Sequence, residues 1–438
     1  MSSSTPRVSV IVPSAERIDL LEACLRSLVK NGPTSIPFEV IAIHHLDRAK
    51  IPASLAGLEL DLRLVHSPVN LGLAGSGNRG RALARGELLV LLHDDAEIEP
   101  GWLEALVETA DAHPEAGAVG SKVLFPDGRL QSAGMILWGD GVTSPPWVGA
   151  APAATAFSEL RAVDYCGTSS LLVRAATWDA MGGLEEECFP AYYVDVNLAM
   201  HVRRLEQSVL YEPRSVIRHH QGASGELRFR RFVTDRNREP FLTRWSRELE
   251  DHEPRIGDPG EAQEEAIARA VARANEMGRR ACVNGAPAAP PEGNAALREW
   301  PVTLHERQNL ERHLALLEDY TVHLTAVLGE TATRAEAAQA ALATLEQTSA
   351  REAQGSATRE QALLGAHERI TVLERKLAAE LERSRERDSA GILERARLHA
   401  AAAASQAELQ RITSLASWRL YTRLLPILKR LRAGGSKP

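Results

Sequence analysis

The chain has 438 residues, a formal net charge of −7 and an apolar share of 44%. This length allows two or three domains, and the mildly negative charge argues against a nucleic-acid-binding protein. The four cysteines form no CxxC pair, which argues against a disulfide framework or a zinc site and is typical of a reducing cytosol. The apolar run near the N-terminus is too short for a signal peptide, and no stretch approaches the roughly 18 apolar residues of a membrane span. We therefore expect a cytoplasmic protein.

Strand and helix patterns alternate over the first 250 residues. Runs of β-branched and apolar residues predict strands at 8–12, 38–43, 62–65, 88–92, 118–124 and 169–173. Leucines spaced three and four apart predict a helix over 18–29, and a glycine-rich turn leading into a helix is expected over 70–85. This alternation predicts a mostly parallel α/β sheet with helices on both faces.

The strand predicted at 88–92 ends abruptly in His93, Asp94 and Asp95. Open α/β sheets bind ligands at the carboxyl edge of their strands. Carboxylate oxygens at that edge suit Mg²⁺ or Mn²⁺, and these metals in turn bind phosphates. The alternative for the acidic pair alone is a solvated turn.

The composition changes after about residue 255, where Ala, Glu and Arg dominate. A helix and a linker rich in Pro, Ala and Gly are expected over 251–300, and apolar residues then recur three and four apart for about five heptads over 301–350, which predicts a coiled coil. One seam position holds Leu310, Leu317, Leu324, Thr331, Ala338 and Leu345, and the other holds Leu314, Thr321, Leu328, Ala335 and Leu342. For 351–405 a second coiled coil competes with a solitary charged helix or a disordered tract.

The last segment, 406–438, has no acidic residue after Glu408 and mixes Trp, Tyr and Leu with Arg and Lys. This pattern is typical of an amphipathic helix on an anionic membrane surface, and Pro426 would kink it. Such a tail would place the protein peripherally on the inner membrane face. A helix docked on the protein itself or on a partner is the alternative.

Five motifs stand in a fixed order over residues 7–245. They are VSVIVPSAER, NLGLAGSGNRGRALARGELLVLLHDDAEIEPGWLE, VGSKVLFPDGRLQSAG, GTSSLLVRAATWDAMGGLEEECFPAYYVDVNL and VIRHHQGAS. Together they resemble the family 2 inverting glycosyltransferases of the GT-A fold, especially rhamnosyltransferase-like members. The resemblance implies a GT-A sheet and transfer of a sugar from a nucleotide-diphosphate donor to a glycan or lipid-linked hydroxyl acceptor, with inversion at the anomeric carbon.

The resemblance assigns a metal site. Asp95 takes the metal-binding last position of the family's DxD motif, whose first position here is His93 and whose middle position is Asp94. Asp94 is expected beside the donor. His219 matches a histidine that completes the metal shell in similar enzymes, so Mn²⁺ or Mg²⁺ is expected between Asp95 and His219.

The resemblance also assigns a base and two ligand sides. Asp195 stands where the family has the base that takes the acceptor's proton, with Val194 in place of the usual Glu and Asn197 in place of a frequent second Asp. The alternative is that Asp195 only caps the helix that follows. Pro13, Ser14, Glu16, His44 and Asn78 are expected on the donor side, and Gly167, Thr168 and Tyr193 on the acceptor side. His44 replaces a donor-reading Asp for which Asp47 could substitute, and for the turn around Asn78 an ordinary strand-to-helix turn is the alternative.

Departures from the family pattern leave a second function open. With His44, His93, Val194 and Asn197 changed, the domain could be a degenerate, non-catalytic scaffold that organises partners through its coiled coil. The retained Asp95, Asp195 and His219 argue against that decay. In either case the coiled coil is expected to form a homo-oligomer or to hold a partner enzyme.

Overall fold

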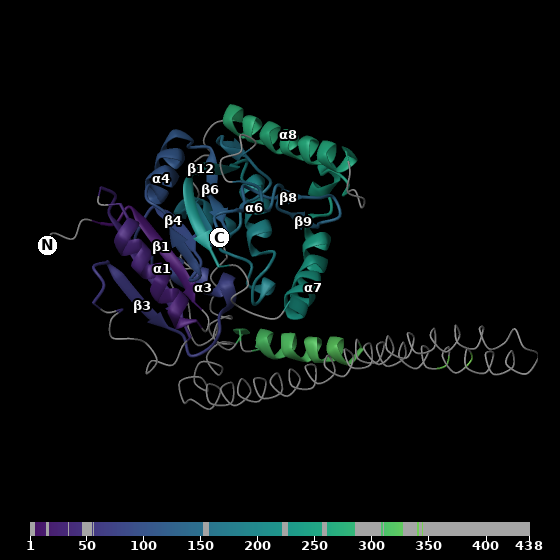
Figure 1. Ribbon diagram of the computed structural model, residues 1–438, viewed down its shortest axis with the longest axis horizontal. Helices are drawn as coiled ribbons and strands as arrows, with labels where there is room; N and C mark the ends of the chain where they lie inside the picture. The colour runs from purple at the N-terminus through teal and green to yellow at the C-terminus, as the bar shows by residue number, and fades with distance from the viewer. Residues whose placement is uncertain are drawn as a thin grey trace, which may run out of the picture. The chain divides into compact units, whose positions relative to one another are not determined.

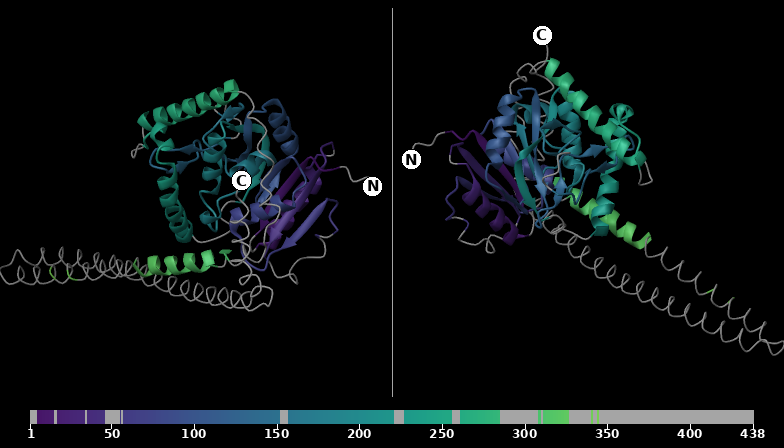
Figure 2. Two further views of the ribbon diagram at one scale, coloured as in Figure 1. Left: turned by 180° about the vertical axis from the view of Figure 1, so that it is seen from behind. Right: turned by 45° about the horizontal axis from the view of Figure 1, so that its top comes forward.

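The structure is a computed structural model, which describes residues 5–14, 17–33, 35–45, 55, 57–151, 157–220, 227–255, 261–284, 308–309, 311–326, 340 and 344. The chain divides into two compact units, Met1–Arg312 and His313–Pro438. Figure 1 shows the sheet and helices of the first unit, and Figure 2 shows them from two further sides.

A ten-stranded sheet forms the centre of the first unit, with the strand order β10-β12-β6-β11-β4-β1-β2-β3. Its strands are β1 (Val8–Ser14), β2 (Phe38–His44), β3 (Leu62–His66), β4 (Leu88–Leu92), β5 (Ala96–Ile98), β6 (Ala116–Leu124), β7 (Leu130–Ser132), β10 (Arg161–Ala162), β11 (Ser170–Arg174) and β12 (Ser208–His219). Strands β4, β1, β2 and β3 run parallel, and β11 lies antiparallel between β4 and β6. This is the mostly parallel α/β sheet that the sequence predicts. Outside it, β8 (Ile136–Leu137) pairs with β9 (Thr143–Ser144).

Helices cover both faces of the sheet, so its central strands are apolar on both sides, as parallel strands usually are. Val10 and Val12 of β1 belong to one core with α1 (Ile18–Asn31) and α4 (Trp102–Ala112). Ile11 belongs to the opposite core with α3 (Gly72–Leu83), α5 (Ala175–Met181) and α6 (Val194–Arg204). The alternation along β1 therefore fixes which helices lie on which face.

The glycine-rich stretch over 72–80, predicted as a turn, lies inside α3. A Cβ added at Gly80 would come within 2.3 Å of Ile11 Cγ2, and one at Gly77 within 2.7 Å of Leu184 Cδ1. These glycines let α3 pack closely on the sheet and on the chain beside it. Close packing, which outweighs the low helix propensity of glycine, accounts for them without a ligand.

The first unit continues beyond the domain boundary that the sequence predicts at residue 250. Helices α7 (Leu227–Trp245) and α8 (Glu261–Asn284) follow β12. A Cβ at Gly278 of α8 would lie 2.4 Å from the Cβ of Ala162 in β10, and Arg273 donates to Asp164 Oδ2 at 2.6 Å. Helix α8, visible at the top of Figure 1, thus belongs to the α/β domain.

Of the predicted coiled coil, the structure describes a helix over 311–326, of which 313–326 belong to the second unit. Leu317 and Leu324 of the first seam position are buried, whereas Leu314 and Thr321 of the second are only half-buried and Tyr320 is buried instead. Most of the remaining seam, the 351–405 stretch and the 406–438 tail lie outside the described residues. Among the residues that the structure describes, no helix is long and apolar enough to cross a membrane.

Candidate active site

Three side chains with metal-binding atoms meet at the carboxyl end of β4. His93 and Asp95 follow β4, and His219 ends β12. Strand β5 pairs antiparallel with β12 so that Ala96 lies opposite His219, which sets His219 beside Asp95. The ligand atoms of His93, Asp95 and His219 lie within 4.8 Å of one another. The predicted convergence of Asp95 and His219 is therefore present in the structure, and His93 joins them.

Neighbouring side chains fix the two imidazole rings. His219 Nε2 lies 3.0 Å from Asp95 Oδ1, while its Nδ1 lies 2.6 Å from Gln131 Oε1. Gln131 Nε2 donates to the His219 carbonyl at 3.3 Å, so its Oε1 faces Nδ1 and requires the N–H there. Nε2 is thereby the ring nitrogen that faces Asp95 and would bind a metal ion there, with Gln131 as the outer partner of the ring.

His93 has a different outer partner, because its Nε2 lies 3.2 Å from Thr168 Oγ1 and its Nδ1 lies 3.9 Å from Asp95 Oδ1. Burial, and secondly the proximity of His219, lower the pKa of His93 to about 4, so the ring is neutral at pH 7. Burial alone would raise the pKa of Asp95, but the hydrogen bond from His219 outweighs it and the pKa falls to about 2. One ionised carboxylate and two imidazoles form a donor set that fits a divalent metal ion.

Asp195 lies near this group because of the antiparallel pairing of β11 with β4. Ser170 of β11 is opposite Leu92 of β4, so the residues before β11 run beside those after β4, and the His93 N–H donates to the Ser169 carbonyl at 3.2 Å. A Cβ added at Gly167 would lie 3.8 Å from Asp195 Oδ2. The short segment from Gly167 to Ser169 therefore links the metal-binding group to Asp195.

The environment of Asp195 favours a base. Burial raises its pKa to about 6, although the hydrogen bond from the Val196 N–H to Oδ1, at 3.0 Å, acts in the opposite direction. Helix α6 begins at Val194 with Tyr193 as its N-cap, so Asp195 lies in the first turn and is not the capping residue. A carboxyl group with a pKa near the operating pH is well suited to accept a proton.

Two of the residues predicted on the donor side, Ser14 and His44, lie at the carboxyl ends of neighbouring strands. Ser14 of β1 is opposite His44 of β2, which is opposite His66 of β3. Ser14 and His44 are buried, and the His44 and His66 rings meet edge to face with 5.4 Å between centroids. Pro13 and Asp94 are half-buried, and Glu16 and Asp47 lie outside the described residues. Contact of these residues with a donor stays a prediction.

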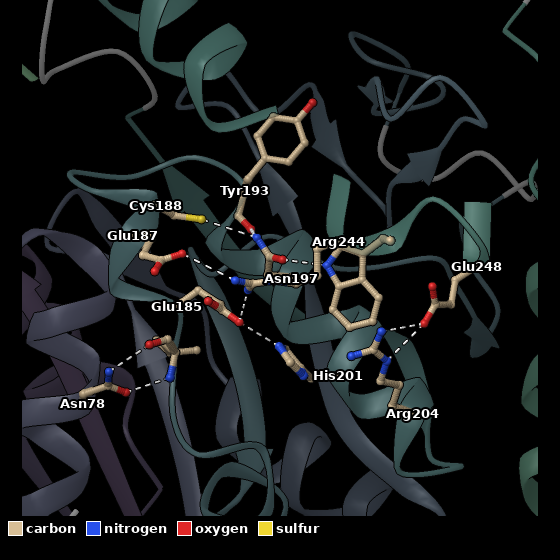
Figure 3. A network of polar contacts seen from close by, with 12 residues as sticks. Asn78, Glu185, Glu187, Cys188, Tyr193, Asn197, His201, Arg204, Arg244 and Glu248 are labelled. Atoms are coloured by element: carbon tan, nitrogen blue, oxygen red, sulfur yellow. Dashed lines mark hydrogen bonds and ion pairs between the residues drawn. The ribbon is translucent and has the colours of Figure 1, made fainter. Parts of the chain in front are cut away.

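Asn78 and Tyr193, predicted on the donor and acceptor sides, hydrogen-bond to other parts of the protein. Asn78 accepts from the Leu184 N–H at 2.8 Å and donates to the Leu184 carbonyl at 2.9 Å and to Glu186 Oε1 at 3.0 Å, so it fastens this loop to α3 (Figure 3). Tyr193 is 4% exposed, and its hydroxyl donates to the Gly141 carbonyl at 2.8 Å. Both side chains therefore make contacts within the protein, and their contact with a ligand stays a prediction.

Gln131 is the functional residue that sequence reasoning missed. It lies in β7, which pairs with β6, and β6 pairs with β12, so two long-range pairings bring it to His219. Gln131 lies in the motif VGSKVLFPDGRLQSAG, but the motif alone does not show that its side chain reaches His219. Sequence reasoning likewise assigned no role to Tyr192 or Asn237, which adjoin the segment before Asp195.

Residues 9–179 match the family described as Glycosyl transferase family 2. This match agrees with the family resemblance carried by the five motifs over residues 7–245. The matched residues include His93 and Asp95 and end before Asp195 and His219. The strand order agrees with the α/β sheet that the sequence predicts.

Curated relatives match parts of the chain. It is similar to the O-antigen biosynthesis protein RfbC of Myxococcus xanthus, with 33% identity over 50% of this chain and 18% of that protein. The N-acetylglucosaminyl-diphospho-decaprenol L-rhamnosyltransferase of Mycobacterium tuberculosis is 27% identical over 37% of this chain and 60% of its own length. An uncharacterized protein of Sinorhizobium fredii, y4gI, is 29% identical over 50% of this chain and 25% of its own. The chain thus spans at most 60% of these relatives.

Solved structures resemble the chain more loosely. GalNAc-T7 with UDP, GalNAc and Mn²⁺ has a TM-score of 0.46 and 13% identity, covering 57% of this chain and 50% of its own. The mannosyltransferase PcManGT of Pyrobaculum calidifontis in complex with GDP-Man and Mn²⁺ has a TM-score of 0.41 and 19% identity, covering 65% of this chain and 76% of its own.

Proposed function

We propose that this chain is a metal-dependent inverting glycosyltransferase that moves a sugar from a nucleotide-diphosphate-sugar to a hydroxyl acceptor in the synthesis of O-antigen or another cell-surface polysaccharide. The observation that carries the proposal is the group of His93, Asp95 and His219, joined by the Gly167–Ser169 segment to Asp195 inside a family 2 domain. A hexose or a deoxyhexose is the expected sugar.

Asp95, His219 and His93 would hold the metal. Their mixed oxygen and nitrogen donors suit Mn²⁺ better than Mg²⁺, which prefers oxygen ligands in strict octahedral geometry. When bound, a divalent ion neutralises the charge that grows on the departing diphosphate. Gln131 and Thr168 keep the two rings in place for that task.

Asp195 would act on the opposite side of the anomeric carbon. As the acceptor oxygen bonds to that carbon, its proton passes to the Asp195 carboxylate, and the bond from the carbon to the nucleoside diphosphate breaks. With a pKa of about 6, Asp195 is mostly ionised at pH 7 and yet basic enough to accept the proton. Val194, which is buried beside it, contributes to the desolvation that raises this pKa.

The other predicted partners are part of the same proposal. A lipid-linked acceptor would be confined to the inner membrane face, and the basic tail over 406–438 would bring the enzyme to that surface. The coiled coil would form a homo-oligomer or hold a partner enzyme. No observation favours the alternative of a non-catalytic scaffold, because the metal-binding group and Asp195 are both retained.

A thermal-shift screen of nucleotide-sugars with and without Mn²⁺ tests the proposal, since a ligand stabilises a protein by RT ln(1 + [L]/Kd). One nucleotide-sugar should raise the melting temperature only when Mn²⁺ is present, and the same compound should release its nucleoside diphosphate when an acceptor is added. If no nucleotide-sugar stabilises the protein under either condition, the proposed function is wrong.

A further inference from the structure

The segment before Asp195 has an unusual backbone. Tyr192 and Tyr193 are consecutive residues in the left-handed region, with φ of 68° and 62°. Bulky residues seldom adopt this conformation, and it persists only where the surroundings over-determine it. Tyr193 is also the N-cap of α6, so the turn sets the direction in which Val194 and Asp195 leave it.

Two buried asparagines hold this turn. Asn237 of α7 donates through Nδ2 to the carbonyls of Ala191, at 2.8 Å, and Tyr192, at 3.2 Å. Asn197 of α6 donates through Nδ2 to the carbonyl of Tyr193 at 2.8 Å. Both side chains belong to residues no more than 3% exposed. Three successive carbonyls before Asp195 are thus bonded to amides from two different helices.

The orientation of the Asn197 amide is fixed by Trp245. The indole Nε1–H, which can only donate, lies 2.8 Å from Asn197 Oδ1, so Nδ2 must face the Tyr193 carbonyl. Figure 3 shows Asn197 between Tyr193 and Cys188, whose Sγ lies 3.3 Å from Nδ2. An aspartate here could accept from Trp245 but would oppose a carboxylate oxygen to the Tyr193 carbonyl oxygen. Asparagine therefore fits this site better than the aspartate that the family resemblance implies.

Charged groups around Asn197 hold the helices that carry the two amides. His201 Nε2 of α6 lies 2.9 Å from Glu185 Oε1, and Glu185 also pairs with Arg244 of α7. Arg204 of α6 pairs with Glu248 beyond α7 at 2.8 Å (Figure 3). Ion pairs and hydrogen bonds therefore hold α6, which carries Asn197, and α7, which carries Asn237, in place.

We propose that Asn197 and Asn237 are positioning residues that form a two-amide clamp, which holds the Tyr192–Tyr193 turn and thereby keeps the Asp195 carboxylate sheltered beside Gly167. The clamp itself does not depend on the proposed function, whereas its effect on catalysis rests on that function. The replacement of the family's second Asp by Asn197 is then part of a working site and not a sign of decay.

The other titratable groups near Asp195 do not interfere with a test of this clamp. Tyr165, Cys166, Cys188 and Tyr193 are those whose charge couples to Asp195, and burial raises the pKa of each, to about 12 for the two thiols. All four are neutral near pH 6. The Asp195 carboxyl is therefore the group among them that titrates in that range.

The test is a carbon-13 NMR titration of the full chain labelled at aspartate carboxyl carbons, with the Asp195 signal identified by its loss in Asp195→Asn. Asn197→Ala and Asn237→Ala should each let water reach the carboxylate, so the pKa of Asp195 should fall from about 6 toward its ordinary 3.8. Asn78→Ala removes an equally buried amide from the loop at Leu184 and should leave that pKa unchanged. An unchanged pKa in both clamp variants would overturn the proposal.

A second, more conservative variant keeps the test decisive if the alanine variants do not fold. Trp245→Phe keeps the ring but frees the Asn197 amide to rotate, so it should lower the pKa of Asp195 by a smaller amount, and no change in this variant would also contradict the clamp. Where transfer is measurable, Asn197→Ala should lower kcat at unchanged donor KM and move the acidic limb of the rate profile in step with the NMR value. If the wild-type chain shows no transfer, the proposed function fails while the titration still decides the clamp.

Discussion

His219 Nε2 lies 3.0 Å from Asp95 Oδ1, although the two residues are far apart in sequence. The β5–β12 pairing creates this contact, since Ala96 is opposite His219. The hydrogen bond occupies the two atoms that would share a metal ion. We therefore expect the pair to exchange its direct contact for a common ion, with little movement of the strands that carry it.

The first prediction concerns Asp95. Asp95→Ala removes the carboxylate of the metal-binding group, so Mn²⁺ should no longer enhance binding of a nucleoside diphosphate, whereas the fold should persist. Calorimetric titration with UDP and GDP, each with and without Mn²⁺, measures this effect. Asp127→Ala, which removes an exposed carboxylate paired with Arg129, is the control. Equal enhancement in wild type and Asp95→Ala would exclude Asp95 as a ligand.

The second prediction concerns Gln131. Gln131→Leu removes the acceptor that holds His219 Nδ1–H and should weaken Mn²⁺ binding roughly 10–100-fold, the usual effect of losing an outer partner of a metal-binding histidine. Gln131→Glu keeps an acceptor and should restore most of the affinity. Titration with Mn²⁺ followed by electron paramagnetic resonance measures both. Equal affinity in Gln131→Leu and wild type would show that the ring needs no such support.

The contrast between Asp95 and Gln131 shows what the sequence could predict. Asp95 follows an apolar strand, and His219 lies within the motif VIRHHQGAS, so the family resemblance predicts that the two residues meet. Gln131 reaches His219 through two strand pairings that no local pattern encodes. Asn78 lies in a motif that predicted a place beside the donor, yet its side-chain amide hydrogen-bonds to Leu184 in the loop that packs on α3. Motifs thus locate a site, whereas the use of each side chain depends on long-range packing.

The helical parts show the same limit. Glycines over 72–80 predicted a turn, but the closeness of Ile11 and Leu184 demands a helix without side chains at Gly80 and Gly77. In the 311–326 helix, the buried residues include Leu317 and Leu324 as the heptads predict, but Tyr320 takes the place expected for Thr321. A threonine offers less apolar surface than a neighbouring tyrosine, so burial favours the tyrosine.

The third prediction concerns the 311–326 helix. Leu317 and Leu324 are buried, whereas Val322 on the same helix is 70% exposed. Replacing both leucines with Lys should therefore disrupt their packing, which lowers helicity by circular dichroism and changes the elution volume on size exclusion. Val322→Lys is the matched control and should change neither. If the double variant has the same helicity and elution volume as Val322→Lys, burial of Leu317 and Leu324 contributes neither to helix stability nor to assembly.

The last prediction separates the activity of Asp195 from its effect on stability. Asp195→Asn keeps the size of the side chain but cannot accept a proton, so transfer should fall by roughly 10² or more at normal donor affinity. In the wild type, the rate should fall as the pH decreases through about 6, because Asp195 then becomes protonated.

The stability effect has the opposite sign. Burial raises the pKa of Asp195 from 3.8 to about 6, so the folded protein binds this proton more tightly than the unfolded chain does. Stability therefore falls as the pH rises from about 4 to about 6, and the full cost of the ionised carboxylate is present above pH 6. Asp195→Asn removes that cost. Because the side chain keeps some contact with water, the gain should be about 1–2 kcal/mol at pH 8 and should shrink toward zero as the pH approaches 4. Urea unfolding at both pH values measures it, and the exposed Asp127→Asn should show no such pH-dependent gain. If Asp195→Asn loses activity and is also less stable than the wild type at pH 8, the ionised carboxylate stabilises the fold. Burial then does not make the charge of Asp195 unfavourable.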